Sequence, residues 1–315
     1  GAGLSLCFCG RLNAASRKIL EGAGYPYRAF GEPLGEEEIM ASALAERGTP
    51  GLWVFDLLDT RPAWIRFLQG LGVRVVCVDD RGAGLDLADE VILTMPFAFM
   101  DRRVHTASER IRYGLEYMIL PEERFGGERE GRVAAARGSC RIGVSMGGSD
   151  THGSTVVLAR ALDKVLTPQE EVVFFTGPSF EHGKDLEEAL ASSRLAWQIR
   201  PAVPDLLGDL KAMDVVLTSG GMTLFEAIGM GLPVLAFAGE PFEQDNIRFL
   251  AEQGACVDLG CVCSTSSREL IERLRRGLGD GDVLAGMGRR GAELMAGSGP
   301  GPVVRRLAFH LERRS

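Results

Sequence analysis

Residues 214–226 read DVVLTSGGMTLFE, and this stretch decides how the carboxyl-terminal half of the chain folds. A short apolar run at Val215–Thr218 is typical of a buried strand. A Gly-Gly turn follows, and then an amphipathic helix is expected at Met222–Met230. The glycines let the backbone turn sharply, and the helix directs its free N–H groups and the positive end of its dipole outward.

The polar side chains of this stretch suggest what it could bind. Gly220 and Gly221 allow a close backbone approach, while Ser219 and Thr223 offer hydroxyl donors to a phosphate. Glu226 lies about one helical turn further on, where a carboxylate could accept both hydroxyls of a ribose. Together they describe a nucleoside-diphosphate clamp. The same residues also fit a tight turn with a Ser/Thr cap and a glutamate that interacts with the helix dipole, and both interpretations stay open.

A second Gly-Gly turn, MGGSD at residues 146–150, lies between a predicted strand and a helix expected from Ser154. Gly147 and Gly148 could therefore close on the same diphosphate from another side. Alternatively, Asp150 simply caps the helix, and His152 is a solvated loop histidine.

Candidate sugar contacts come from two further places. Gln244 and Asn246 fall in or near the first turn of a predicted helix, where amides could hydrogen-bond sugar hydroxyls; a polar turn stabilised by its acids is the alternative. Asp56 follows a predicted strand and could orient a sugar or activate water, which makes it the one candidate catalytic residue. Asp59, just before Pro62, suits helix capping better.

Short apolar runs alternate with amphipathic stretches along the whole chain, which predicts an α/β fold with parallel sheets. We expect two doubly wound, Rossmann-like domains that face a ligand-binding cleft: residues 1–130, residues 138–300, and a carboxyl-terminal helix in 301–315 that returns to the first domain. The polar, glycine-rich segment 124–139 marks the junction. The predicted strands are Leu4–Cys9, Tyr25–Phe30, Leu52–Phe55, Val73–Val78, Glu90–Leu93, Arg141–Ser145, Val172–Thr176, Trp197–Ile199, Val215–Thr218, Val234–Phe237 and Ala255–Asp258. The predicted helices are Leu12–Glu21, Glu36–Glu46, Pro62–Leu71, Ser154–Lys164, Lys184–Ser192, Pro204–Met213, Met222–Met230, Phe242–Gln253, Ser267–Leu278 and Pro302–Arg314.

Composition excludes several classes of protein. The 315 residues are 45% hydrophobic and 25% charged, which excludes a mainly disordered chain. A net charge of −8 argues against a nucleic-acid groove or a polybasic membrane surface, and no apolar run is long enough to span a membrane. Seven cysteines without a C-x-x-C, together with four scattered histidines, give no zinc pattern. We therefore expect a reduced cytoplasmic protein with no metal and no cofactor.

Taken together, these motifs resemble a known family. The pattern from Ser219 to Glu226, the G-L-P of Gly231–Pro233 and the Gln/Asn helix resemble the carboxyl-terminal half of GT-B nucleotide-sugar enzymes such as the MurG-type glycosyltransferases. Further segments resemble the UDP-sugar hydrolases of pseudaminic acid biosynthesis (PseG) and their SpsG-like relatives; they are VFDLLD at 54–59, VCVDD at 76–80, ADEVI at 88–92, GLEYMILPEERF at 114–125 and VSMGGSD at 144–150.

The resemblance implies a UDP-sugar held between the domains. It assigns Glu226 to the ribose, the Gly147 and Gly220 loops to the diphosphate, and Asp56 with the Gln244 region to the sugar, from which water displaces UDP. A MurG-like glycosyltransferase is the first alternative. Leu58 stands near a position where the family has tyrosine, and the family's G-x-G-H histidine is absent, since the first histidine here is His105.

The amino-terminal sequence suggests two explanations for the missing histidine. The first predicted strand and helix resemble the second βα unit of the family, so we expect that a first unit is missing from the sequence. If the chain is natively complete, a non-catalytic nucleotide-sugar-binding protein is the second alternative.

Overall fold

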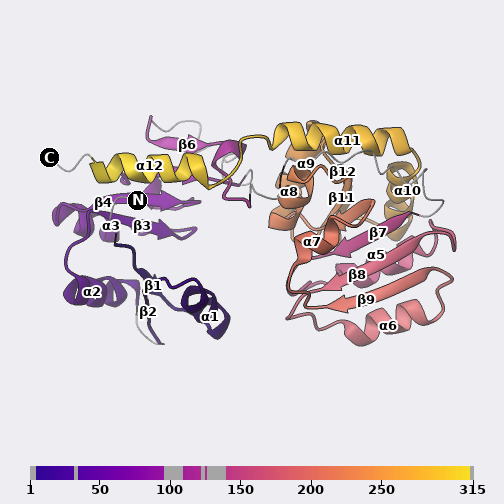
Figure 1. Ribbon diagram of the computed structural model, residues 1–315, viewed down its shortest axis with the longest axis horizontal. Coiled ribbons are helices and arrows are strands. Elements are labelled where there is room, and N and C mark those ends of the chain that lie inside the picture. The colour runs from indigo at the N-terminus through magenta and orange to yellow at the C-terminus, as the bar shows by residue number, and fades with distance from the viewer. Residues whose placement is uncertain (1–4, 32–34, 96–108, 122–124, 126–139, 313–315) are drawn as a thin grey trace. The chain divides into compact units, whose positions relative to one another are not determined.

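The computed structural model describes residues 5–31, 35–95, 109–121, 125 and 140–312 (Figure 1). By its internal contacts the chain divides into two compact units. Unit 1 comprises residues 1–91 and 306–315, and unit 2 comprises residues 92–305. Most of the junction predicted at 124–139 lies outside the described residues.

Unit 2 is built on one six-stranded sheet in which every strand pair is parallel. Its strands are β7 (Arg141–Ser145), β8 (Glu171–Thr176), β9 (Ala196–Pro201), β10 (Val215–Thr218), β11 (Val234–Ala238) and β12 (Val257–Cys261). Their spatial order, β12-β11-β10-β7-β8-β9, is the Rossmann order 3-2-1-4-5-6 when the strands are counted from β7. The predicted doubly wound domain is therefore present.

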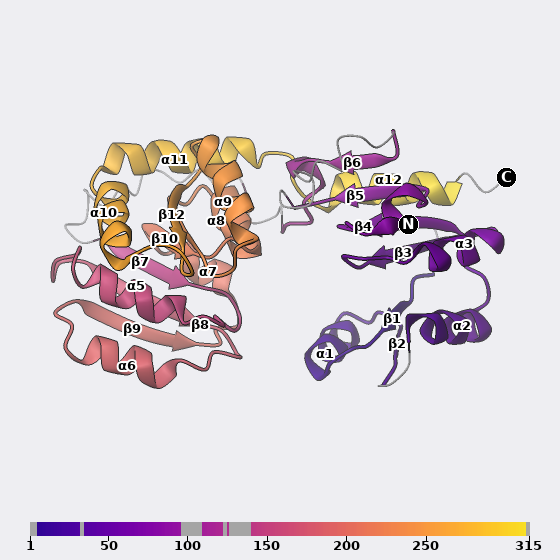
Figure 2. The ribbon, with the colours of Figure 1, turned by 180° about the vertical axis from the view of Figure 1, so that it is seen from behind.

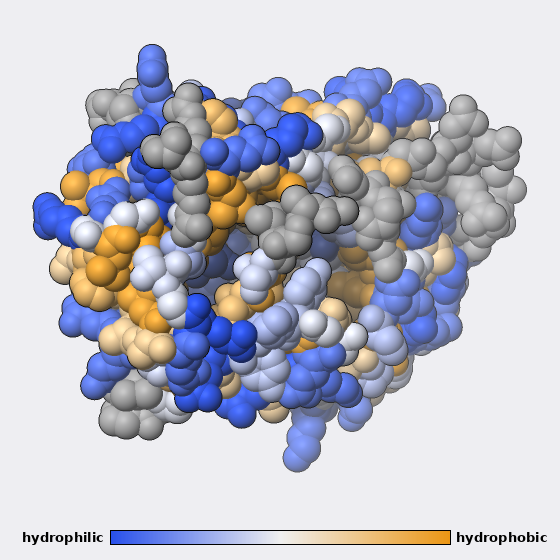
Figure 3. Space-filling model, turned by 60° about the vertical axis from the view of Figure 1, so that its left-hand side comes forward, coloured by the Kyte–Doolittle hydropathy of each residue, from blue (hydrophilic) through white to orange (hydrophobic). Residues whose placement is uncertain are grey.

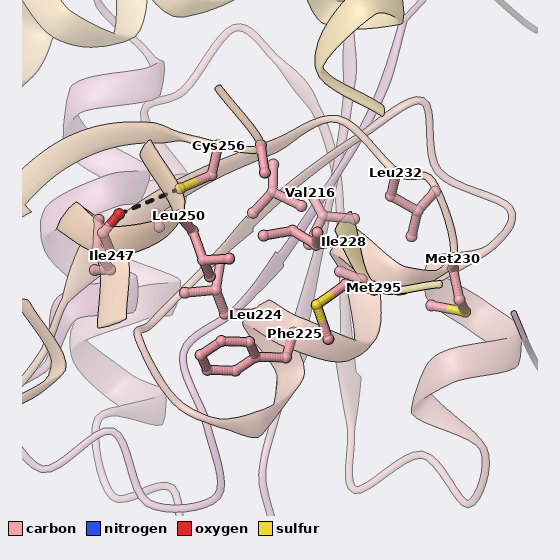
Figure 4. Close-up of a cluster of buried hydrophobic side chains, with 14 of the residues drawn as sticks. Val216, Leu224, Phe225, Ile228, Met230, Leu232, Ile247, Leu250, Cys256 and Met295 are labelled. Carbon is pink, nitrogen blue, oxygen red and sulfur yellow. Dashed lines mark hydrogen bonds between the residues drawn. The ribbon is translucent and has the colours of Figure 1, made fainter. Parts of the chain in front are cut away.

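Side chains alternate between the two faces of this sheet because successive residues of a strand point to opposite sides. Val216 and Ala236 join one core with α7 (Leu206–Leu210), α8 (Met222–Gly229) and α9 (Glu243–Glu252). Figure 4 shows part of this core, where Phe225 and Ile228 of α8 lie beside Leu250 of α9. The opposite face packs against α5 (Ser154–Leu162), α6 (Gly183–Ala191) and α10 (Ser267–Leu278).

The sequence did not predict helix α11 (Gly281–Leu294), because glycines within a helix normally weaken it. Here they permit close packing against the region around α8. A Cβ on Gly288 would come within 2.4 Å of the Gly231 carbonyl oxygen, and one on Gly291 within 2.8 Å of Cγ2 of Ile228. Tertiary packing thus overrides helix propensity.

Two further sheets are formed by the described residues before β7. One pairs β1 (Phe8–Gly10) with β2 (Tyr27–Ala29) in parallel; the other has the order β3-β4-β5-β6. The elements that start within unit 1 are α1 (Ala14–Gly22), α2 (Glu36–Arg47), β3 (Leu52–Asp56), α3 (Pro62–Gly70), β4 (Arg74–Val78), the 3₁₀ turn η1 (Ala83–Asp86) and β5 (Glu90–Leu93). The strand β6 (Ile111–Tyr113) and the 3₁₀ turn η3 (Leu115–Tyr117) fall within residues 92–305, which group with unit 2. The strand predicted at Leu4–Cys9 is displaced to Phe8–Gly10.

The division between the units falls at 91/92 instead of the expected 130. Tertiary packing is the reason, since Met95, Met118 and Leu120 are buried in the core of unit 2. In the opposite direction, helix α12 (Pro300–Glu312) begins in unit 2, and its last residues group with unit 1.

Buried charges hold the end of α12 within unit 1. The Glu90 carboxylate, at the start of β5, is 2.6 Å from the Arg306 guanidinium and 2.8 Å from Nε2 of His310. Glu90 is almost fully buried, so removing either partner would leave a costly unpaired charge.

The surface mixes hydrophilic and hydrophobic residues (Figure 3). Its exposed large apolar side chains include Leu6, Ile19 and Val54 in unit 1. Among the described residues, no helix combines the length and hydrophobicity that a membrane span requires.

Candidate functional site

The strongest candidate site lies where β7 and β10 are neighbours at the centre of the unit 2 sheet (Figure 2). The chain leaves these strands for helices on opposite faces of the sheet, α5 after β7 and α8 after β10. In open α/β sheets such a reversal of direction creates a binding place beyond the carboxyl ends of the strands. Both predicted Gly-Gly turns leave the sheet at this carboxyl edge.

The turn 219–221 presents an open helix N-terminus. Gly221 is the N-cap of α8, no side chain caps the helix, and its first turn carries no acid. Within the described part of the chain, the N–H groups of Gly221, Met222 and Thr223 have no acceptor. These groups and the helix dipole can therefore stabilise an anion.

Two contacts from α9 fix the turn 219–221 in place. Nδ2 of Asn246 donates a 2.8 Å hydrogen bond to the Gly220 carbonyl oxygen. A Cβ on Gly220 would come within 2.5 Å of the Glu243 carbonyl oxygen, so a side chain has no room there. The site's geometry thus depends on α9 as well as on its own glycines.

The turn 146–153 is built differently. The Asp150 carboxylate accepts hydrogen bonds of 2.8 Å from the backbone N–H groups of both Ser154 and Thr155. Asp150 is buried and has a φ of 45°, a conformation that aspartate tolerates better than most residues. The capping alternative for Asp150 is confirmed, and its negative charge occupies the N-terminus of α5.

At a third turn, residues 239–242, a nearby side chain also accepts hydrogen bonds from the backbone N–H groups. Oε2 of Glu243 accepts hydrogen bonds from the N–H groups of Gly239 at 2.8 Å and Glu240 at 3.2 Å. The Glu240 side chain points to another partner, because its Oε1 lies 3.0 Å from Nε2 of His152. His152 therefore links the turn 146–153 to the turn 239–242.

Two buried hydroxyl groups at this edge have no hydrogen-bond partner within the described residues, Thr218 Oγ1 and Ser154 Oγ. Thr218 is the last residue of β10, and Ser154 is the first residue of α5; both residues are fully buried. Ser154 Oγ lies 3.7 Å from the position a Cβ on Gly239 would take. An unsatisfied buried hydroxyl costs stability, so a ligand or water that satisfies it is the natural explanation.

The predicted nucleotide residues fall on the two turns and on α8. Gly147 and Ser219 lie close together, with 4.0 Å between Ser219 Oγ and the Cβ position of Gly147. Gly148 is exposed, and its carbonyl oxygen accepts a hydrogen bond from the N–H of Ser179. Thr223 and Glu226 are half-buried in the first part of α8. Their contacts with a nucleotide stay predictions.

The two candidate sugar amides are buried and engaged within unit 2. Nε2 of Gln244 donates to Oδ2 of Asp258 at 2.9 Å, and Asn246 holds Gly220 as described above. The structure thus gives both a positioning role that the sequence did not predict, and their contact with a sugar stays a prediction.

In unit 1 the candidate Asp56 is the exposed last residue of β3. Partial desolvation and, after it, the nearby Asp79 carboxylate raise the pKa of Asp56 above its usual value. A raised pKa suits a group that accepts a proton near neutral pH. Asp80 is instead fully buried and accepts hydrogen bonds from the N–H groups of Thr60 and Gly82.

The capping role predicted for Asp59 is wrong. The N-cap of α3 is Arg61, without a side-chain hydrogen bond, and Pro62 occupies the first helical position. Proline there needs no N–H partner, which removes one of the groups that a cap would satisfy.

The described residues contain no group of three or more His, Cys, Asp or Glu side chains that could hold a metal ion. All seven cysteines are free thiols. The Sγ atoms of Cys261 and Cys263, at the end of β12, lie 2.7 Å apart.

Known proteins with a similar sequence or structure identify this fold. No protein-family model matches the sequence. The spore coat polysaccharide biosynthesis protein SpsG of Bacillus subtilis (strain 168) is 24% identical over 251 residues, which are 79% of this chain and 73% of SpsG. The structure of Acinetobacter baumannii MurG superposes with a TM-score of 0.65 at 15% identity, covering 95% of this chain and 89% of MurG.

A complex of S. aureus MnaA with UDP gives a TM-score of 0.63 at 14% identity, with 94% of this chain and 87% of MnaA covered. At these identities the structural likeness establishes the fold. The chain has the GT-B fold, with two Rossmann-like domains.

The sequence offered helix capping by Asp150 and a polar turn stabilised by its acids as alternatives, but it did not predict the two unpartnered hydroxyls. For Thr218 and Ser154 no local signal exists, since burial without a partner depends on the assembled sheet.

Proposed function

We propose that this protein binds a UDP-sugar and hydrolyses it to UDP and the free sugar. The observation that carries the proposal is the open N-terminus of α8, which lies beside the unpartnered Thr218 hydroxyl at the centre of a Rossmann-ordered sheet. This combination suits a diphosphate, which needs several hydrogen-bond donors and a positive electrostatic potential.

The nucleotide would use the residues of α8 in order. The diphosphate would accept hydrogen bonds from the N–H groups at the start of the helix and from the hydroxyls of Ser219 and Thr223. Glu226 follows one turn later and would accept the hydroxyls of the ribose. The co-structure of MnaA with UDP, a protein of the same fold, supports uridine diphosphate as the nucleotide.

Hydrolysis would proceed by attack of water on the anomeric carbon. The bond from that carbon to the phosphate oxygen breaks, and its electron pair leaves with UDP. The α8 N-terminus would stabilise the charge that develops on the leaving diphosphate. Asp56 is our candidate for the base that takes the proton from water, because a carboxylate whose pKa is raised by desolvation is a stronger base than a free one.

The proposal also covers the biological setting, for which the relatives provide the support. SpsG is described as a spore coat polysaccharide biosynthesis protein, so synthesis of a surface polysaccharide, of the nonulosonic acid type or related to it, fits this chain. The likeness to MurG favours a second candidate, transfer of the sugar to an acceptor instead of water.

Ligand-induced stabilisation tests the binding step. UDP, GDP, CMP and NAD are each added at millimolar concentration, and thermal unfolding is followed. A ligand at about 100 times its Kd adds roughly 2.7 kcal/mol to the free energy of unfolding, a shift of a few degrees. Selective stabilisation by UDP supports the proposal, and no shift with any of the four contradicts it.

Product release tests the reaction. The protein is incubated with UDP-N-acetylhexosamines, and UDP is measured with and without added acceptor sugars. Release in water alone supports hydrolysis, and release only with an acceptor supports transfer. Binding without release would identify a nucleotide-sugar-binding protein.

A further inference from the structure

We propose that His152 binds the diphosphate of the nucleotide directly and is a basic side chain of the unit 2 site. The inference rests on the proposed function and adds a residue that the sequence analysis interpreted as a solvated loop histidine.

The loops at the carboxyl edge of the sheet contain few basic side chains. Six loops leave it, at residues 146–153, 177–182, 202–205, 219–221, 239–242 and 262–266, and none of them contains lysine or arginine. Their only basic side chains are His152 and His182. Protein sites for phosphates normally combine backbone N–H groups with at least one cationic side chain. In unit 2 these loops can offer only a histidine.

The second observation is the position of His152 among these turns. His152 contacts Glu240, whose backbone is tied to the Glu243 carboxylate. Glu243 in turn lies against the turn 219–221, with its Oε1 3.7 Å from the Cβ position of Gly221. His152 thus belongs to the same set of packed turns as the open N-terminus of α8. Its side chain is about half exposed, so it can exchange Glu240 for a ligand without disrupting the core.

The third observation concerns the other charged groups that face His152. Glu240 is its direct partner, while Asp150 and Glu243 are engaged by backbone N–H groups. The His182 ring lies against Gly153, with its Nδ1 3.4 Å from the Cβ position of that glycine and 3.7 Å from the Asp185 carboxylate. His152 therefore has one acidic partner, the part-exposed Glu240, which it would exchange for the diphosphate.

The experiment compares ligands that differ only in their phosphates. Binding of UDP, UMP and uridine to the full chain is measured by calorimetry for the wild type and for His152→Gln, with His182→Gln as the matched control. We expect His152→Gln to weaken UDP binding about tenfold, as for the loss of a charge-assisted hydrogen bond, and to leave uridine binding unchanged. His182→Gln should leave both unchanged. Equal loss for uridine and UDP in His152→Gln would overturn the inference.

A double variant separates direct binding from simple neutralisation of Glu240. If His152 only shields the diphosphate from Glu240, then His152→Gln combined with Glu240→Gln restores UDP affinity. If His152 binds the diphosphate, the double variant stays about tenfold weaker than Glu240→Gln alone. Restoration of wild-type affinity overturns the inference.

Absence of UDP binding by the wild type would contradict the proposed function itself.

Discussion

The Gly-Gly turns at 146–153 and 219–221 leave neighbouring strands of one sheet, and each leads into a helix of eight or nine residues. In the first turn, the Asp150 carboxylate lies at the helix N-terminus and accepts hydrogen bonds from two backbone N–H groups. In the second, no side chain does so, and the buried Thr218 hydroxyl also lacks a partner within the described residues. The first helix N-terminus is thus satisfied by a side chain of its own turn, whereas that of α8 is left open. A Gly-Gly motif after a strand therefore does not by itself indicate a phosphate site. What matters is whether a nearby side chain already accepts the hydrogen bonds of the helix N-terminus.

The largest effect is expected from Gly220→Ala. Its Cβ would meet the backbone of Glu243, so α9 or the turn must move, and the free energy of unfolding should fall by about 2–3 kcal/mol with loss of UDP binding. Gly148→Ala is the matched control, because no atom lies within 4 Å of its Cβ position. Chemical denaturation and calorimetry on both variants measure the contrast. Equal effects of the two substitutions would contradict the distinction between the turns.

Glu226→Ala addresses the nucleotide assigned to the open turn. Loss of a hydrogen-bonded charge should weaken UDP binding by about 1–3 kcal/mol. Wild-type protein should lose part of that energy with 2′-deoxyuridine diphosphate, while the variant should bind both nucleotides equally. Unchanged UDP affinity in Glu226→Ala would refute the ribose assignment.

Asp150→Asn tests the filled turn. The amide keeps the shape and the tolerance for positive φ but loses the charge and one acceptor oxygen, so stability should fall by about 1–2 kcal/mol. UDP affinity should not decrease, because the N-terminus of α5 is not part of the proposed phosphate site. Thermal unfolding and calorimetry of the variant check both expectations. A drop in UDP affinity with stability retained would reverse the roles of the two turns.

The sequence could predict most of unit 2, because the short apolar runs of its strands and the amphipathic pattern of its helices are local features. The strands Arg141–Ser145 and Val215–Thr218 and the helix Ser267–Leu278 have the predicted bounds. Helix α11 was missed because its glycines make sense only against Gly231 and Ile228, which are distant in sequence.

The candidate site shows the same limit. Its residues could be named from local motifs, but their roles depend on contacts made across the sheet. The bond from Asn246 to Gly220 joins helix α9 to the turn 219–221, and the boundary between the units depends on where Met95 and Met118 are buried. No window of sequence contains that information.

Thr218→Val tests whether the open turn is kept unsatisfied for a ligand. Valine has nearly the same shape and removes a buried hydroxyl without a partner, so the free energy of unfolding should rise by about 1 kcal/mol. UDP binding should weaken severalfold if the hydroxyl donates to the diphosphate. Denaturant unfolding and calorimetry on the same preparation would give both values. A loss of stability would show that the hydroxyl is satisfied in the free protein.

The smallest effect concerns Asp56, which extends the comparison to unit 1. Asp150 accepts two backbone hydrogen bonds, whereas within the described residues Asp56 accepts none, and desolvation together with Asp79 raises its pKa. A carboxyl whose pKa is raised on folding stabilises the folded state only while it is protonated. That contribution is present below its unfolded pKa, near 3.8, and is lost as pH rises through the higher folded value. At neutral pH the ionised Asp56 is therefore slightly destabilising.

Asp56→Asn should raise the Tm at neutral pH by about one degree or less, since the side chain is exposed, and the gain should vanish in acid. The same variant should release UDP from a UDP-sugar more slowly, because asparagine cannot take a proton from water. A gain in stability without a loss of rate would show that the ionised Asp56 destabilises the fold but does not take the proton from water. Another residue would then have to be the base.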